Sequence, residues 1–269
     1  MRKIGFIGAG NMAGALIKGL LRANVCAPAD IMVSDVAVAQ VQKLRRQYKV
    51  VGAADNHAVV RGARTIILSV KPQVMATVLA DLRVVASTRH LFISIAAGIP
   101  LRRLEAGLGT GMRVVRVMPN TPALIGQGMS VAVAGRNATA ADLKRTLRLF
   151  QAVGRAESVT SERLIDPVTA VSGSGPAFVY LFAEHLIAGG TKAGLSPDLA
   201  ARLTFQTILG AAGMMLETDL SPRALREMVT SPGGTTLAGL TALDAHHFRE
   251  AVLAAIDAAT RRARELAAS

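Results

Sequence analysis

Short apolar runs recur through the first 160 residues of this chain, and most are bounded by Gly, Pro, Asn or charged residues. Near-continuous runs of this kind are typical of strands buried on both faces of a sheet. Between them, segments with a helical period cover about 11–23, 37–48, 72–85 and 139–150. Alternating strands and helices predict an α/β domain with a parallel, doubly wound sheet. The predicted strands are Ile4–Ile7, Ile31–Ser34, Thr65–Val70, Leu91–Ile95, Val114–Met118 and Met129–Ala134.

From about Ser161 the pattern becomes helical throughout, and no further strand is predicted. Three serines, each followed closely by a proline, predict helix N-caps: Ser174 with Pro176, Ser196 and Ser221. The chain therefore divides into an α/β domain over 1–160 and an all-α domain over 161–269. The predicted helices of the second domain are Asp166–Val171, Gly175–Ala193, Pro197–Glu217, Pro222–Val229, Thr235–Leu243 and Phe248–Leu266.

The helical domain has more apolar residues than a domain of its size can bury. Ile208–Leu216 and Ala251–Ala259 carry very little charge. A domain of about 110 residues cannot bury so much apolar surface alone, and helices that are apolar on more than one face usually contact a second partner. We therefore expect an intertwined homodimer built on the C-terminal half.

Charge and cysteine content narrow the class of protein. The net charge of +13 comes from scattered basic pairs such as Arg45-Arg46 and Arg261-Arg262, without a zinc-finger or aromatic RNA-binding pattern, so nucleic-acid binding is not expected. The single cysteine, Cys26, excludes an internal disulfide and a cysteine-based zinc site. We expect no signal peptide and no membrane span, and hence a soluble cytoplasmic protein.

A Gly-rich turn follows the first predicted strand. Gly8-Ala9-Gly10-Asn11-Met12-Ala13 fits the Gly-x-Gly-x-x-Ala form of the dinucleotide-binding turn. Gly8 would allow the tight turn, Gly10 would let a pyrophosphate approach the backbone, and Ala13 would allow close helix–strand packing. Because the turn joins a strand to an amphipathic helix at the start of a βαβ run, we expect a Rossmann-type nucleotide site.

Asp35 ends the second strand, about 20 residues after the glycines, where an acid binds the ribose 2′-OH of NAD. Taken alone, an acid at this position favours NAD over NADP, because it repels a 2′-phosphate. The alternative is that Asp35 caps the helix that begins near Ala37.

Two further segments follow strands at the edge where ligands bind in such sheets. Val70-Lys71-Pro72 follows one strand, and Lys71 could meet the nicotinamide ribose or a carboxylate, or be a plain surface lysine. Asn120 lies between two prolines in a stiff turn after another strand. It could face the nicotinamide or simply form the turn.

The most informative stretch of the helical half is Ser231-Pro232-Gly233-Gly234-Thr235-Thr236. Two glycines between a proline and two hydroxyl residues expose a run of backbone N–H groups. At a helix start, such a run can bind an anion. Together with the dinucleotide turn, it indicates a reductase that acts on a small anionic substrate.

With these motifs in place, the chain resembles the pyrroline-5-carboxylate reductase family over essentially its whole length. The resemblance rests on the Gly-rich turn, Val70-Lys71-Pro72, Ser94–Gly98, Met118–Pro122, Val171–Ala177 and Met228–Thr236. It implies a Rossmann domain followed by an all-α C-terminal dimerisation domain, assembled as dimers or decamers. It also implies reduction of 1-pyrroline-5-carboxylate to L-proline, generally with NADPH, with NADH as the alternative that Asp35 favours.

The resemblance also assigns residues. It implies that the cofactor contacts Asn56, Ala97 and Gly98 besides the residues already named, although Asn56 could equally be the N-cap of the short helix after it. The 231–236 loop would hold the substrate carboxylate through Ser231, Gly233, Gly234, Thr235 and Thr236, with the Thr236 hydroxyl at the ring nitrogen.

The chemistry fits these residues. Hydride transfer to an imine requires the nicotinamide and the imine carbon to be held in near-attack geometry. Thr236 can bond to the ring nitrogen and orient the ring, while a neutral hydroxyl is a poor acid, so the proton would come from solvent or with the substrate. The five histidines provide no ordered acid, and no metal site is expected.

Two other functions are disfavoured. A related hydroxyacid dehydrogenase usually depends on a catalytic lysine in the helical half, and here only Lys192 lies beyond residue 150. A nucleotide sensor without turnover would not need the 231–236 segment.

Overall fold

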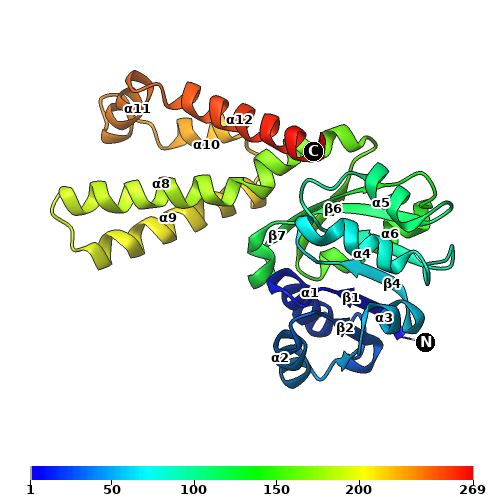
Figure 1. The fold of residues 1–269 in the computed structure, drawn as a ribbon. Helices are drawn as coiled ribbons and strands as arrows, with labels where there is room; N and C mark the ends of the chain where they lie inside the picture. The colour runs from blue at the N-terminus through cyan, green and yellow to red at the C-terminus, as the bar shows by residue number, and fades with distance from the viewer. Residues whose placement is uncertain (1, 269) are drawn as a thin grey trace. The chain divides into compact units, whose positions relative to one another are not determined.

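The computed structural model describes residues 2–268 and contains two compact units. The first runs to Ser174 and also includes the segment from Ala259 onward, and the second comprises Gly175–Ala258. Figure 1 shows the mixed α/β part and the helical part of the chain.

The first unit is built on a single eight-stranded sheet in the order β3-β2-β1-β4-β5-β6-β7-β8. All the predicted strands are present, as β1 (Arg2–Ile7), β2 (Ile31–Ser34), β4 (Ala63–Leu68), β5 (Leu91–Ser94), β6 (Arg113–Met118) and β7 (Gly128–Ala134). The expected doubly wound α/β fold is confirmed, with one correction: β7 runs antiparallel to β6. Only the 3₁₀ turn Thr121–Ile125 lies between these two strands, and a parallel pair needs a much longer crossover.

Two strands were not predicted. β3 has only the residues Val51–Gly52, and β8 (Gly154–Ser158) lies at the opposite edge of the sheet. Ala156 is the one buried residue of β8, and its neighbours are polar. Edge strands of this composition lack the apolar run that marks a central strand.

Helices cover both faces of the sheet. The first face is covered by α1 (Asn11–Arg22), α2 (Val38–Tyr48) and α6 (Ala140–Gln151), whose apolar side chains share one core cluster with β1, β2 and β4–β8. The second is covered by α3 (Asn56–Gly62), α4 (Met75–Leu82) and α5 (Leu101–Leu108). Helix α5 was not predicted, although Leu101, Leu104 and Leu108 are all buried at helical spacing.

The helical half follows the prediction closely. It contains α7 (Ile165–Val168), a π-helical turn over Thr169–Gly173, α8 (Gly175–Lys192), α9 (Pro197–Glu217), α10 (Pro222–Met228), α11 (Thr235–Ala245) and α12 (Phe248–Ala268). The hydroxyls of Ser196 and Ser221 accept N–H groups at the starts of α9 and α10, as expected for N-caps. Ser174 is not an N-cap: it has right-handed helical backbone angles, because the chain continues from the π-helical turn into α8.

Large apolar side chains remain exposed along the second unit. Helices α8 and α9 lie side by side (Figure 1) and bury only Ala183, Ala200 and Thr204. Exposed side chains include Tyr180, Phe205, Leu209, Met215 and Leu216. Among the described residues, α9 is the one helix that is long and apolar enough to cross a membrane by length and composition, with 11% of its most apolar window buried. The second unit therefore presents apolar surface that its own helices leave uncovered.

A buried histidine makes the stability of the first unit depend on pH. His90 is fully buried before β5, and its Nδ1 accepts the backbone N–H of Ser87 at 3.1 Å. Burial, reinforced by the nearby Arg89, lowers the pKa of His90 below its ordinary value of 6.5. As pH falls through about 6.5, the unfolded chain binds a proton that the folded chain does not, so the folded state loses stability.

We therefore expect the unfolding free energy to fall between pH 7 and pH 5, with a contribution from His90 of at most about 1.4 kcal/mol per pH unit. Urea unfolding of the wild type and of His90→Gln over this range measures the contribution. The variant should show a shallower slope, whatever its stability at pH 7. Equal slopes in the two proteins would show that His90 is not the group responsible.

Candidate functional site

The residues expected to bind a nucleotide lie along one edge of the sheet. The strand register aligns Ser34, Ile7, Leu68, Ser94 and Arg116 in one row across β2, β1, β4, β5 and β6. The Gly-rich turn, Asp35, Val70–Pro72, Ala97–Gly98 and Asn120 all follow this row within a few residues. Because these strands are parallel, the segments meet at their carboxyl edge, where such sheets bind ligands.

The turn after β1 requires glycine at its first position. Gly8 has φ +100°, and a Cβ there would lie 2.6 Å from the carbonyl oxygen of Ser69. The Ser69 hydroxyl donates to the Ile7 carbonyl at 3.0 Å and the Gly8 carbonyl at 2.8 Å. These contacts fix the turn against the end of β4. Sequence reasoning did not single out Ser69, since a serine after a strand carries no distinctive signal.

Gly10 differs from Gly8. It has ordinary extended backbone angles, φ −72° and ψ −174°, and a Cβ added there would meet no heavy atom within 4 Å. Gly10 is the N-cap of α1, and no side chain forms a capping hydrogen bond there. The N–H groups of a first helical turn have no acceptor within the helix and favour anions. The space above Gly10 therefore suits a pyrophosphate.

Asp35 connects the turn to the start of α2. Its Oδ2 accepts the backbone N–H of Ala9 at 2.7 Å, and its Oδ1 accepts that of Ala37 at 2.8 Å. Ala37 is the N-cap residue of α2, so Asp35 supports the helix start from outside it. Each carboxylate oxygen can accept more than one hydrogen bond. Asp35 therefore keeps acceptor capacity for a ribose hydroxyl while it holds the turn.

Asn56 lies beside the same corner of the sheet. Its Oδ1 accepts the Ser34 hydroxyl at 2.8 Å, and its Nδ2 donates to Asp81 at 3.4 Å. The interpretation of Asn56 as an N-cap is wrong: the cap of α3 is Asp55, whose side chain accepts the N–H of Ala58. The side chain of Asn56 therefore links the ends of β2 and α4 at the edge near Asp35.

The segments after β4 and β6 differ in how their polar groups are used. Lys71 is exposed and precedes the 3₁₀ turn Pro72–Val74, whereas Val70 and Pro72 are half-buried. Asn120 is fixed within the protein: its Oδ1 accepts the N–H of Met129 at 2.8 Å, and its Nδ2 donates to the Ser172 carbonyl at 3.2 Å. The Asn120 side chain thus braces the turn, while Lys71 projects freely enough to meet an anion.

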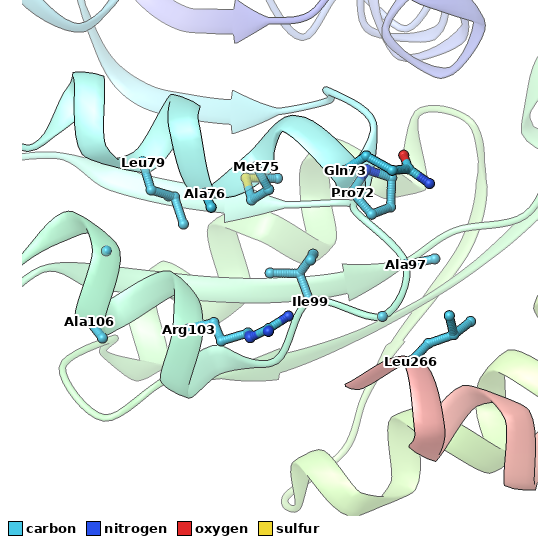
Figure 2. A pocket seen from close by; sticks show the side chains of 12 residues that line it. Pro72, Gln73, Met75, Ala76, Leu79, Ala97, Ile99, Arg103, Ala106 and Leu266 are labelled. Carbon is cyan, nitrogen blue, oxygen red and sulfur yellow. The ribbon is translucent and has the colours of Figure 1, made fainter. Parts of the chain in front are cut away.

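The loop after β5 lines a pocket with a volume of about 640 Å³. Figure 2 shows Ala97 and Ile99 on this loop, with Pro72 and Gln73 of the 3₁₀ turn before α4 on one side and Arg103 of α5 on the other. Ala97 is exposed, and Gly98 has φ +72°. The walls are mostly apolar, so the pocket is suited to a flat or apolar group at the end of the sheet.

The second unit carries the 231–236 segment at the start of α11. Gly233 has φ +67°, and a Cβ on Gly234 would collide with the Ser231 hydroxyl. The N–H of Gly234 donates to the Ser231 carbonyl at 3.1 Å, closing a turn. Thr235 and Thr236 are the first two residues of α11, and such residues have no acceptor for their N–H groups within the helix. The N–H groups open to an anion are therefore those of Thr235 and Thr236.

A second, polar pocket was not anticipated from the sequence. It has a volume of about 270 Å³ between α1 and α2 and is bordered by Gly10, Asn11, Lys18, Lys43 and Tyr48. Its two lysines place positive charge near the Gly-rich turn.

Within residues 2–268, no group of three or more His, Cys, Asp or Glu side chains could hold a metal ion.

Known proteins resemble this chain over its whole length. Residues 162–266 match the family model for pyrroline-5-carboxylate reductase dimerisation, and residues 3–98 match the model for NADP oxidoreductase, coenzyme F420-dependent. A pyrroline-5-carboxylate reductase from Methanosarcina acetivorans is 43% identical over 265 residues, which cover 98% of each chain. This chain belongs to the pyrroline-5-carboxylate reductase family.

Solved structures agree with the assignment over the whole length. The family's enzyme from Coxiella burnetii superposes with a TM-score of 0.93 at 36% identity and covers 98% of both chains. The Plasmodium falciparum enzyme, solved with NADP bound, gives a TM-score of 0.88 at 32% identity, with 99% of this chain and 98% of that chain covered. The resemblance inferred from the motifs is therefore confirmed, and so is a cofactor of the NAD(P)H type.

Proposed function

We propose that this pyrroline-5-carboxylate reductase reduces the C=N bond of 1-pyrroline-5-carboxylate with NAD(P)H and releases L-proline, the last step of proline synthesis. The observation that carries the proposal is that the full-length similarity includes both functional segments, the Gly-rich turn and the 231–236 segment. A direct test uses cofactor deuterated at the transferable position. Proline with one deuterium on the former imine carbon is expected, and unlabelled proline would contradict hydride transfer.

The cofactor site would be formed by the carboxyl edge of the sheet. Gly8, Ala9, Gly10, Asn11 and Met12 would hold the pyrophosphate, because Gly10 leaves the start of α1 open. Asp35 and Asn56 would lie at the adenosine ribose, beyond β2. The nicotinamide end would meet the residues after β4, β5 and β6, namely Val70, Lys71, Pro72, Ala97, Gly98 and Asn120. When bound, the nicotinamide supplies the hydride.

The substrate site would be the start of α11. The backbone N–H groups of Thr235 and Thr236 would bind the substrate carboxylate, and the turn Ser231–Gly234 would bring Ser231 and Gly233 beside it. The Thr236 hydroxyl would bond to the ring nitrogen, which orients the imine carbon toward the nicotinamide. Thr236 is the residue in contact with the reacting bond, and the proton on nitrogen would come from solvent or arrive with the substrate.

Asp35 sets an expectation for cofactor preference. Its carboxylate lies where a 2′-phosphate of NADPH would be repelled. Asp35→Ser is expected to raise the ratio of kcat/KM for NADPH to that for NADH by about tenfold, because it removes the charge and keeps an acceptor. Initial rates with each cofactor measure the ratio. Asp30→Asn removes a carboxylate at the other end of β2 and should leave the ratio unchanged, and no change in Asp35→Ser would exclude Asp35 as the determinant.

The exposed apolar surface of α8 and α9 supports assembly as a homodimer through residues 161–269, with residues 1–160 as the dinucleotide-binding domain. A second copy, rather than lipid, would cover α9, consistent with a cytoplasmic protein that binds neither membrane nor nucleic acid. Size-exclusion chromatography with light scattering, without detergent, should give a dimer or a decamer. A stable monomer would contradict this assembly.

A further inference from the structure

The last turn of α12 lies against the loop that joins β5 to α5. Gly98 is at the tip of this loop, and a Cβ added to it would lie 3.1 Å from the Cβ of Leu266. Leu266 also borders the large pocket beside Ala97 and Ile99, as Figure 2 shows. The end of the helix therefore lies in close contact with the loop, and a side chain at position 98 would be strained at φ +72° and would push against Leu266.

Two polar contacts attach the same part of α12 to its surroundings. Arg102, near the start of α5, donates from Nη2 to the carbonyl oxygen of Ala267 at 3.4 Å. One turn earlier, Arg264 lies 4.0 Å from Asp166 of α7, and Ala263 is buried. The end of α12 thus lies against the first unit, to which residues from Ala259 onward belong, with Leu266 itself 44% exposed.

The two ends of the loop are fixed independently of α12. Its first end continues β5, which pairs with β4 and β6. Its second end is held by Glu162, whose Oε1 accepts the N–H of Leu101 at 2.7 Å and pairs with the buried Arg116 at 2.8 Å. Between these anchors, Gly98 has a left-handed backbone and Ala97 is exposed. The contact with α12 therefore supports the part of the loop that its anchors leave free.

We propose that the last turn of α12, through Leu266 and Ala267, is a positioning element for the nicotinamide end of the cofactor site. This rests on the proposed function, in which Ala97 and Gly98 face the nicotinamide. Loss of the contact would let the tip of the loop move, and a displacement of about 1 Å near a reacting centre can strongly reduce turnover. The adenosine end of the cofactor site would lie next to β2, and β2 and β5 are on opposite sides of β1 in the sheet. Binding at the adenosine end would therefore be unaffected.

The test compares the full chain with a chain that ends at Arg264 and with Leu266→Ala. Glu265→Ala is the matched control, because Glu265 is in the same turn but forms only an exposed pair with Arg262. Three quantities are measured in each protein: hydrogen exchange of the 95–101 segment without ligand, the Kd for NADPH, and the Kd for 2′,5′-ADP, which lacks the nicotinamide. Circular dichroism and Tm establish that each variant is folded.

We expect faster exchange of the 95–101 segment and about five- to tenfold weaker NADPH binding in the truncated chain, with a smaller effect in Leu266→Ala. Binding of 2′,5′-ADP should change less than about twofold, and the control should match the wild type. Unchanged exchange and unchanged NADPH binding in the truncated chain would overturn the proposal, as would equal weakening of both ligands. If the wild type binds neither NADPH nor NADH, the proposed function fails, whereas the exchange measurement still reports on the contact.

Discussion

Gly10→Val is expected to abolish cofactor binding while leaving the protein folded. A Cβ at Gly10 meets no protein atom within 4 Å, and the backbone angles of φ −72° and ψ −174° suit a β-branched residue. The valine side chain would occupy the space through which a pyrophosphate approaches the start of α1. We expect nucleotide affinity to fall by about a hundredfold or more, and the unfolding free energy to fall by no more than about 1 kcal/mol, because valine is a poorer N-cap residue than glycine.

Nucleotide titration followed by fluorescence, with urea unfolding of the same samples, measures both effects. Gly8→Val is the contrasting variant: its Cβ would lie 2.6 Å from the Ser69 carbonyl at a φ of +100°, so it should destabilise the first unit itself. Retained nucleotide affinity in a folded Gly10→Val protein would show that the pyrophosphate does not bind at this turn.

Thr236→Ala is expected to lower kcat/KM for 1-pyrroline-5-carboxylate by about tenfold to a hundredfold. The hydroxyl is lost from the position proposed for the ring nitrogen, whereas the backbone N–H at the start of α11 remains. Thr236 is half-buried and lies in the first turn of the helix, so little change in Tm should accompany the loss. Steady-state kinetics and thermal unfolding test the two parts of the expectation.

Thr235→Ala is the matched control, because it removes the same atoms from the neighbouring helical residue and preserves the N–H group. Its kcat/KM should stay close to that of the wild type. An unchanged kcat/KM in Thr236→Ala, or an equal loss in both variants, would remove the specific role proposed for the Thr236 hydroxyl.

The parts of the fold that the sequence predicted are those with strong local signals. Strands buried on both faces appeared as apolar runs, and Ser-Pro pairs located the starts of α9 and α10. The missed elements have weak signals: β3 contains two residues, and β8 is polar at an edge of the sheet. The antiparallel direction of β7 depends on the short connection after β6, which an apolar run does not encode.

For the candidate site, the sequence predicted which segments take part but not which hydrogen bonds their polar side chains form within the protein. The Gly-rich turn and the 231–236 segment have motifs whose residue types follow from backbone geometry. The hydrogen bonds that join Asp35 to the Ala9 N–H and Asn120 to the Ser172 carbonyl depend on residues distant along the chain. The same holds for the contact between Gly98 and Leu266, since no local pattern relates two residues so far apart in the sequence.

The most direct test of the central claim is the initial rate of NADPH and NADH oxidation with 1-pyrroline-5-carboxylate, measured side by side on the purified protein. We predict substrate-dependent oxidation of at least one cofactor with formation of proline, and the ratio of the two rates shows what the Asp35 carboxylate does. Nucleotide binding without turnover on either cofactor would contradict the claim and would indicate another cyclic imine as substrate, or a nucleotide sensor.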